Sequence, residues 1–493
     1  MTNLYRIHPQ PSFNFGGLVI DNFAGGGGAS TGIELGLGRP VDIAINHAPD
    51  AVAMHTTNHP HTRHFCESVW EVNPRDIVGT QPVELCWFSP DCKHFSKAKG
   101  NVPVSKEIRG LAWVALRYAA TVRPRVIMLE NVEEFVTWGP INQEGRPCPK
   151  NKGRTFTTFV NALRRQGYQV EWKELRGCDY GAATIRKRLF MICRRDGQPI
   201  TWPAPTHAEP THPAVKSGQL KPWRTAGDII DWSIPCPSIF TRKKPLADKT
   251  LARIARGLKR FVIDSRTPYI VNNNKAGFIT EHANGSSQRN MPAAEPVRTI
   301  CAEVKGGHFA LVTAFLAKHY GGNYTGPGSN LTDPLSTVTT VDHNALVTAH
   351  IQRDFGTSTG HAKDRPLGTI TADGGGGKSA LVQAFLIKYY GQVQGQTLAD
   401  PLHTITTVDR MGLVMVRGEP WRIVDIGMRM LEPHELFAAQ GFPADYIHDR
   451  LADGTKLSKK AQVRMVGNSV CPPVAAALVR ANLVDQQTGE VAA

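Results

Sequence analysis

Four side chains in three short stretches of the sequence could together do covalent chemistry. Cys92 stands in SPDCKHFS, Glu130 lies near the end of RVIMLENV, and Arg186 and Arg188 lie in TIRKRLFM. Most cysteines behave as small buried hydrophobes, but Cys92 lies in a polar, basic loop that a substrate can reach. A thiolate, a carboxyl group and guanidinium groups are a coherent set for reaction at an electron-poor heterocycle. Taken singly, the carboxylate could be a solvated one and the arginines a surface pair.

A glycine-rich stretch, DNFAGGGGASTG at 21–32, follows an apolar run and precedes a helical pattern. Glycine lets the backbone approach a ligand closely, and the free N–H groups at a helix start bind polar groups. The stretch lacks the Lys-Ser/Thr pair of a phosphate-binding loop, and no acidic residue clearly ends the second expected strand. It predicts either a loop for a nucleotide-like cofactor or only a tight turn.

The elements that must position these residues alternate between strand and helix. Apolar runs of strand length are separated by segments whose apolar spacing is near 3.6 residues. We expect strands at 17–23, 41–46, 83–89, 125–132 and 188–195, and helices at 33–38, 111–122 and 158–168. This alternation predicts an α/β fold with a mostly parallel, doubly wound sheet, whose site lies at the strand ends.

Beyond residue 196, proline, tryptophan and threonine become frequent and the helical spacing fades. A unit resembling Pro-Leu-x-Thr-Ile-Thr, followed by a Leu-Val pair, recurs four times, with its prolines at 296, 334, 366 and 401. Its β-branched stretches and glycine-rich turns predict short strands. The repeat could be a structural module or a nucleic-acid reader. Helical texture returns at 428–442 and near the C-terminus, so we expect three parts, at 16–195, 196–424 and 425–493.

The composition narrows the class of protein. The chain has 493 residues, a formal net charge of +15 and a pI of about 9.5. Such a charge favours a nucleic-acid partner, although a solvated basic surface would carry it equally well. Nine cysteines without a CxxC pair indicate neither a disulfide framework nor a zinc site, and reduced thiols indicate the cytosol. No apolar run of about 18 residues occurs, and we expect no membrane contact and no metal.

Six motifs, in order along the chain, resemble those of the DNA cytosine-5 methyltransferases. They are DNFAGGGGAS, SPDCKHFS, LENV, DYGAATIRKRLF, RMLEPHELFAAQGFP and GNSVCPPV. The resemblance covers about 17–195 and 425–483, and the residues between occupy the family's variable target-recognition region. It implies a Rossmann-like S-adenosylmethionine-dependent methyltransferase fold, with a β-rich target-recognition domain.

The resemblance also implies roles for single residues. Cys92 would be the nucleophile that adds to C6 of cytosine, and Glu130 would contact N3 and the exocyclic amine. Arg188 would bind O2, and Arg186 would support Glu130 or the base. A lid over 96–109 would contact DNA, or would only be a solvated loop; its implied contacts are Ser96, Lys97, Lys99 and Arg109. The implied S-adenosylmethionine site comprises Asp21, Phe23, Ala24, Gly25, Gly26, Gly27, Asn46, His47, Glu67, Ser68, Pro90, Asn468 and Ser469.

Three departures from the family pattern stand out. Asp91 and Lys93 flank Cys92 where the family has proline and glutamine, and Thr184 replaces a glutamine. Asn46 replaces the acidic residue that holds the cofactor ribose; its amide oxygen can accept a hydrogen bond, but without charge. The pattern resembles a divergent branch of the family that is often found in phages and prophages.

The expected function is methyl transfer from S-adenosylmethionine to C5 of a flipped-out cytosine in double-stranded DNA, through a covalent adduct between Cys92 and C6. The enzyme would modify or protect DNA as a monomer, in the cytoplasm of a bacterial or phage-infected cell, with any cleavage left to a separate restriction endonuclease. Two alternatives stay open. One is a catalytically inactive relative that only binds DNA, and the other keeps the fold with a modified sulfonium cofactor or an RNA substrate.

Overall fold

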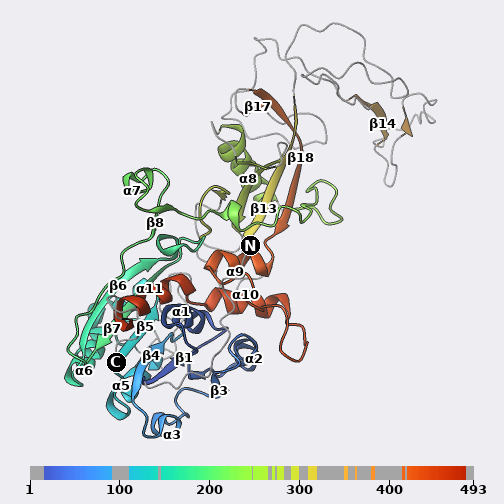
Figure 1. The fold of residues 1–493 in the computed structure, drawn as a ribbon. Coiled ribbons are helices and arrows are strands. Elements are labelled where there is room, and N and C mark those ends of the chain that lie inside the picture. Colours follow the sequence, from blue (N-terminus) through green and yellow to red (C-terminus); the bar gives the residue numbers. More distant parts are fainter. Residues whose placement is uncertain are drawn as a thin grey trace.

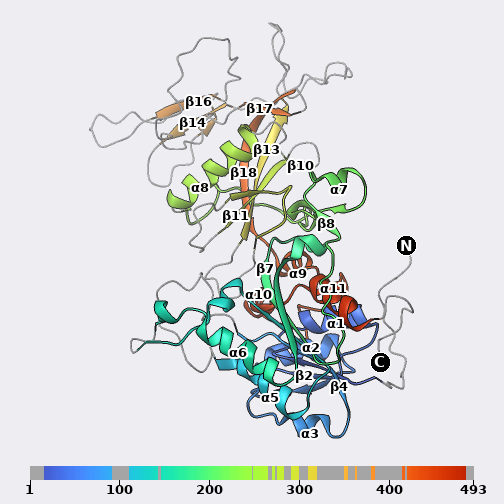
Figure 2. The same ribbon diagram turned by 90° about the vertical axis from the view of Figure 1, so that its left-hand side faces the viewer.

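The computed structural model describes residues 16–91, 110–142, 146–246, 248–264, 269–271, 275–281, 290–298, 309–318, 349–353, 361–362, 379–383, 413–416 and 419–484. Figures 1 and 2 show two parts, an α/β body and a β-rich part, which meet near helices α9 (Pro433–Gln440) and α10 (Lys459–Asn468). No helix among these described ranges is long and apolar enough to cross a membrane.

The body is built on a seven-stranded sheet in the order β3-β2-β1-β4-β5-β7-β6. All pairs from β3 to β5 are parallel, and β7 runs antiparallel to both β5 and β6. β4 and β5 are buried along their whole length, which explains their continuous apolar runs. The predicted doubly wound sheet is confirmed. The strands are β1 Leu18–Asn22, β2 Ile43–Ile45, β3 Arg63–Phe65, β4 Val83–Phe88, β5 Val126–Asn131, β6 Gln169–Arg176 and β7 Lys187–Arg194.

Helices cover both faces of this sheet. One core contains side chains of α1 (Gly28–Leu37) and α11 (Pro472–Leu483), and the other contains those of α3 (Pro74–Val78), α5 (Val114–Thr121) and α6 (Arg154–Arg165). Glycines on α1 allow the close packing of α11, because a Cβ at Gly32 would lie 2.5 Å from the Cβ of Ala475. The C-terminal helix therefore completes the body that the N-terminal residues begin. Helix α2 (Pro49–Asn58) lies between β2 and β3 in sequence.

The second part contains an antiparallel sheet in the order β10-β11-β13-β18-β17, with β12 also paired to β11. Helix α8 (Asp248–Leu258) packs on this sheet (Figures 1 and 2). The predicted β-rich character is confirmed, and three of the four repeated Leu-Val pairs lie in β13, β16 and β17; the other, at 346–347, lies outside the described residues. The strands are β10 Ile270–Val271, β11 Lys275–Glu281, β12 Asn290–Pro292, β13 Phe309–Lys318, β17 Leu413–Val416 and β18 Glu419–Met430.

Smaller elements complete the chain. A three-stranded sheet joins β14 (Ala349–Arg353), β15 (His361–Ala362) and β16 (Ser379–Gln383). The link between the body and α8 carries β8 (His207–Ala208), α7 (Pro213–Lys216) and β9 (Lys221–Pro222).

The prediction of helix at 428–442 is wrong for its first residues. Met428–Met430 end the long strand β18, and helix α9 begins only at Pro433. Proline is favoured in the first helical turn, and Glu432 and Glu435 form a reciprocal capping box there.

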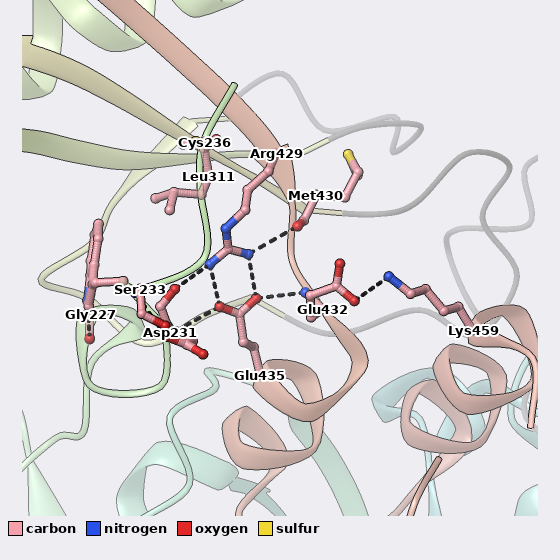
Figure 3. Close-up of polar contacts among 11 residues, drawn as sticks. Gly227, Asp231, Ser233, Cys236, Leu311, Arg429, Met430, Glu432, Glu435 and Lys459 are labelled. Carbon is pink, nitrogen blue, oxygen red and sulfur yellow. Dashed lines mark hydrogen bonds and ion pairs between the residues drawn. The ribbon is translucent and has the colours of Figure 1, made fainter. Parts of the chain in front are cut away.

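A buried ion pair joins the two parts where β18 meets α9 (Figure 3). Two guanidinium nitrogens of Arg429 donate to Glu435, at 2.8 and 2.7 Å. Arg429 also donates to the carbonyl of Asp231, and Glu435 accepts from the backbone N–H of Asp231 and of Glu432. Since Glu435 is fully buried, this network ties strand, helix and linker into one unit.

Candidate active site

The predicted site residues converge at one edge of the seven-stranded sheet. β1 pairs with β2 on one side and β4 on the other, so the chain reverses its winding direction at β1. Open α/β sheets bind ligands at such a switch point, beyond the carboxyl ends of the strands. Because β7 is antiparallel, its first residues lie at the same edge as the last residues of β5, where Asn131 is paired with Leu189.

The glycine-rich loop connects β1 to α1 at this edge. Phe23, Gly25 and Gly27 all have positive φ, at 63°, 55° and 91°. A non-glycine residue in this region is strained, and such strain is concentrated at functional sites. A Cβ at Gly27 would lie 2.5 Å from the hydroxyl of Tyr446 and 2.8 Å from Nε2 of His59, whereas one at Gly25 would meet only the Phe23 carbonyl, at 3.8 Å. The loop is thus packed on one side and has space beside Gly25.

Two buried side chains at the end of β1 have unused acceptors. Asp21 Oδ2 accepts a hydrogen bond from Ser30 at 2.7 Å, while Asp21 Oδ1 and Asn22 Oδ1 have no partner among the described residues. Burial raises the pKa of Asp21 to about 7, hydrogen bonds from Ser30 oppose that rise, and Glu34 adds to it. Leaving a buried acceptor without a partner costs about 1–3 kcal/mol of stability. The end of β1, with these two acceptors, therefore suits a ligand that carries donors or positive charge. S-adenosylmethionine, the implied cofactor, carries both.

The other candidate cofactor residues lie at the neighbouring strand ends. Asn46 follows β2, and its backbone N–H donates to the Phe65 carbonyl of β3, which brings Glu67 and Ser68 near it. The Asn46 side-chain oxygen accepts a hydrogen bond from the Ala48 N–H at 2.9 Å, and this bond stabilises the turn into α2. His47, Glu67 and Asn468 are exposed, Ser68 is half-buried, and Ser469 is buried against Gly28, where a Cβ would overlap its hydroxyl.

Glu130 and the two arginines form a buried cluster. Glu130 is 6% exposed and Arg186 is 4% exposed. Arg188 Nε lies 3.2 Å from Glu130 Oε1, and Arg186 Nη2 lies 4.0 Å from the same oxygen. Burial raises the pKa of Glu130, and the positive charges of Arg188 and then Arg186 act against that rise. Such a carboxyl group can donate a proton to a ring nitrogen.

Arg186 also reaches the C-terminal motif. Its Nη1 donates to the carbonyl of Gly467 at 3.2 Å, so β7 and the end of α10 are tied together beside Glu130. Thr184, which stands where the family has glutamine, accepts from the Arg186 N–H and donates to the carbonyl of Arg298. This threonine therefore links the arginine segment to the first repeat.

Cys92 and the lid residues Ser96, Lys97, Lys99 and Arg109 lie outside the described residues. The segment that leads to Cys92 is described and well anchored. Asn131 Nδ2 donates to the carbonyl of Pro90 at 3.3 Å, and the Ser89 N–H donates to the carbonyl of Asn22. Asn131 was not predicted as a site residue, although it is adjacent to Glu130 in the LENV motif.

Sequence reasoning also missed a group of histidines behind the glycine loop. His55 and His59 come from α2 and its end, and His64 from β3. His55 and His59 are four residues apart, which puts them on one face of a helix, but nothing in the sequence indicates that His64 of β3 joins them.

The comparisons with known proteins show the family to which the chain belongs. The model of the family "C-5 cytosine-specific DNA methylase" matches residues 18–279 and 338–483, which is most of the chain. The type II methyltransferase M.Sau3AI of Staphylococcus aureus is 27% identical over 187 residues, which are 35% of this chain and 42% of that protein. The type II methyltransferase M1.HphI of Haemophilus parahaemolyticus is 26% identical over 194 residues, which are 38% of this chain and 49% of that protein.

The chain thus spans less than half the length of these two relatives. The crystal structure of the S. pombe Dnmt2 methyltransferase is similar with a TM-score of 0.45 and 12% identity, over 94% of this chain and 97% of that one. Since the family match extends over both the glycine loop and the Glu130 cluster, the chain belongs to the C-5 cytosine-specific DNA methylase family.

Proposed function

We propose that this protein transfers a methyl group from S-adenosylmethionine to C5 of cytosine in double-stranded DNA. The observation that carries the proposal is the buried cluster of Glu130, Arg188 and Arg186 beside the anchored segment that leads to Cys92. Asp21 and the glycine loop at the same edge provide the place for the cofactor, which supplies an electrophilic methyl group when bound.

In the proposed reaction, the thiolate of Cys92 forms a bond to C6 of the base. The electron pair of the C5–C6 double bond then makes C5 nucleophilic, and the new methyl–C5 bond forms from it. The bond between the methyl carbon and the cofactor sulfur would break in the same step, and its electron pair would stay on the sulfur of S-adenosylhomocysteine. Glu130 donates a hydrogen bond or a proton to N3, which makes C6 more electrophilic, while Arg188 holds O2 and Arg186 keeps Glu130 in place. A base, such as water, then removes the C5 proton, the double bond re-forms and Cys92 leaves.

The proposal also includes flipping of the target base out of the duplex, and the burial of Glu130 bears on this step. The 6% exposure of Glu130 supports this part of the proposal, because a base stacked in a helix would reach such a carboxyl group poorly and a flipped-out cytosine could approach it. The lid over 96–109 would then contact the DNA, with Lys97 and Lys99 on phosphates. The β-rich part, with its repeats, would read the target sequence.

The test is to incubate purified protein with mixed-sequence DNA and S-adenosylmethionine, then measure nucleosides by mass spectrometry. We expect 5-methylcytosine from the wild-type protein and none from Cys92→Ala. Parallel reactions on RNA, with the mass of the added group measured, distinguish another substrate or a modified cofactor. Absence of modified cytosine from a well-folded protein that binds both ligands would contradict the proposal.

A second candidate, a DNA-binding relative without activity, is favoured by one pair of observations. The Asn46 oxygen is engaged in a turn, and Thr184 bonds to Arg298 rather than to the base site. A duplex with 5-fluorocytosine at the target separates the two, because an active enzyme stays covalently attached to it and an inactive one does not. The first proposal also includes a role in modification or self-protection, a monomeric state, a cytoplasmic location and a separate endonuclease. Measurement of the protein's mass in solution would test the monomeric state, and sequencing of host DNA would test the role in modification.

A further inference from the structure

A line of hydrogen bonds runs from the floor of the cofactor site toward the protein surface. Asp21 Oδ2 is bonded to Ser30 Oγ at 2.7 Å, and Ser30 Oγ lies 2.9 Å from His55 Nε2. His55 Nδ1 lies 2.8 Å from His64 Nε2. Asp21, Ser30 and His55 are at most 1% exposed, whereas His64 is half-buried. Four elements, β1, α1, α2 and β3, contribute one member each.

The line can be protonated in two ways. When Asp21 is ionised, Ser30 donates to it, His55 donates through Nε2 to Ser30, and His64 donates through Nε2 to His55. When Asp21 is protonated, every bond in the line points the other way, and His64 Nε2 becomes the final acceptor. If the other ring nitrogen of His64 carries a proton in both arrangements, His64 is neutral when Asp21 is protonated and cationic when Asp21 is ionised. The two arrangements differ by a proton that rests on Asp21 in one and on His64 in the other.

The buried surroundings and the nearby histidines lower the pKa values of both histidines in the line. Burial, followed by the charges of His59 and His64, lowers the pKa of His55 well below its usual range. Burial and then His59 also lower the pKa of His64, so a proton that arrives there passes readily to water. The remaining titratable neighbours are Glu34, which bonds His59 Nδ1 at 2.9 Å, and Tyr446, whose hydroxyl donates to the Gly26 carbonyl.

A second observation points to a ligand at the inner end. Asp21 Oδ1 is buried and has no hydrogen-bond partner among the described residues. The glycine loop that follows Asp21 has space beside Gly25. The carboxylate therefore has one oxygen in the hydrogen-bond line and one oxygen available to a cationic ligand.

We propose that Ser30, His55 and His64 are positioning residues that hold Asp21 for the cofactor, and that they let a proton leave Asp21 when the positively charged cofactor binds. In the balanced step, Asp21 gives its proton to Ser30, Ser30 gives its own to His55 Nε2, and His55 passes its Nδ1 proton to His64 Nε2. His64 then releases the proton of its other ring nitrogen, Nδ1, to water and keeps its Nε2 proton, so that it still donates to His55. This inference rests on the proposed function, because it takes Asp21 as part of the cofactor site.

The experiment measures protons released when the full-length protein binds S-adenosylmethionine. Calorimetric titrations in buffers of different ionisation enthalpy give this number at each pH, without turnover. We expect release of about one proton per cofactor at pH values below 7, falling toward zero by about pH 8.5. S-adenosylhomocysteine, which lacks the sulfonium charge, should release fewer protons.

Variants test the line itself. Ser30→Ala and His64→Leu remove donors that favour ionised Asp21, so the pH of half-maximal release should rise by about one unit. His64→Gln keeps a donor toward His55 and should restore most of the wild-type midpoint. The exposed His61→Gln is the matched control and should change nothing.

The outcomes separate the inference from the proposed function. No binding of S-adenosylmethionine by the wild-type protein at any pH would contradict the function. Binding without proton release, or with a midpoint that is the same in wild type, Ser30→Ala and His64→Leu, would overturn the inference and leave the function standing. His64 is half-buried, so its variants remain informative if Ser30→Ala does not fold.

Discussion

Glu130 is the described residue whose environment bears most directly on the proposed reaction. Burial disfavours its charge, and the nearby guanidinium groups of Arg188 and Arg186 favour it. A carboxyl group under such opposed influences can hold a proton for a base nitrogen and yet remain oriented by its arginine partners. The charge state of this one side chain should therefore control the rate more than the affinity.

Glu130→Gln tests that expectation. The amide keeps the shape but cannot transfer a proton, so we expect turnover to fall about 10²–10⁴-fold, with DNA and cofactor affinities little changed. Wild-type turnover should also fall as pH rises through the raised pKa of Glu130. The matched control is Glu133→Gln, which changes a carboxylate that is paired with Lys187. Turnover of Glu130→Gln near that of the control would rule out proton transfer by this residue.

Asp21 provides a prediction about stability and pH. Its pKa is about 7 in the folded protein and 3.8 in the unfolded chain, so the unfolded state ionises first. Stability of the ligand-free protein should therefore fall as pH rises from 3.8 to 7, and the full cost should remain above pH 7. Asp21→Asn removes this cost, so the variant should unfold at a higher temperature than wild type at pH 8, with the difference gone near pH 4.

The same variant should bind S-adenosylmethionine more weakly, because an amide lacks the negative charge. Thermal unfolding with and without the cofactor measures both effects in one series. A variant that is less stable than wild type at pH 8 would contradict the assignment of a buried, costly carboxylate.

At the element scale, the sequence predicted four of the five parallel strands and the position of β7, but it missed the short strand β3 and the edge strand β6. β1, β4 and β5 are buried on both faces, so their apolar runs are continuous and easily recognised. β6 is partly exposed, with the polar sequence QVEWKELR, and it was missed. The direction of β7 was not apparent either, because apolar content carries no information on whether a strand runs parallel or antiparallel.

The direction of β7 matters for the site. A parallel β7 would carry Arg186 and Arg188 to the opposite edge, away from Glu130. The sequence identified Glu130 and both arginines through the motifs that they belong to, but their convergence follows from the antiparallel strand. The line from Asp21 to His64 could not be predicted, because it needs side chains from four elements at distances that no local pattern encodes.

The ion pair of Arg429 and Glu435 holds β18 to α9 and supports a prediction at this scale. Glu435→Gln leaves a buried guanidinium group without its counter-charge, so the free energy of unfolding should fall by roughly 3–5 kcal/mol. The double variant Arg429→Met, Glu435→Leu should be more stable than Glu435→Gln, because no buried charge remains. Chemical denaturation measures each value.

The nearby exposed pair of Lys459 and Glu432 offers a matched control. Lys459→Gln removes an ion pair of similar length on the surface, so stability should change little. Equal losses in Glu435→Gln and Lys459→Gln would show that the buried network contributes no more than a surface contact.

At the scale of the whole molecule, the two parts are joined close to the proposed catalytic residues. Val297 of the first repeat pairs with Thr184, and its backbone bonds to Ala183 and Ile185 at 2.7 Å each. Ile185 directly precedes Arg186. The repeat region and the arginine segment therefore share backbone hydrogen bonds. If the β-rich part binds DNA as proposed, its movement would reach the proposed base site through these bonds. This link joins residues more than a hundred positions apart and has no signature in the sequence.

The net charge of +15 supports the last prediction, which concerns how the molecule would bind DNA in the proposed function. Each phosphate contact releases counterions, so the logarithm of affinity falls with the logarithm of salt, with a slope of about −0.9 per contact on duplex DNA. If Lys97 and Lys99 both contact phosphates, Lys97→Ala, Lys99→Ala should make the slope shallower by about 1.8. Affinity should drop on specific and non-specific duplexes alike, because phosphate contacts carry no sequence information.

The control removes two positive charges from the opposite edge of the sheet. Arg123 and Arg195 lie beside the amino ends of the parallel strands, so Arg123→Ala, Arg195→Ala lowers net charge equally without touching the proposed DNA face. Fluorescence anisotropy over a salt series measures both slopes. A shallower slope in the lysine variant alone would locate the contact at the lid, whereas equal slopes in the two variants would mean that only overall charge attracts the DNA.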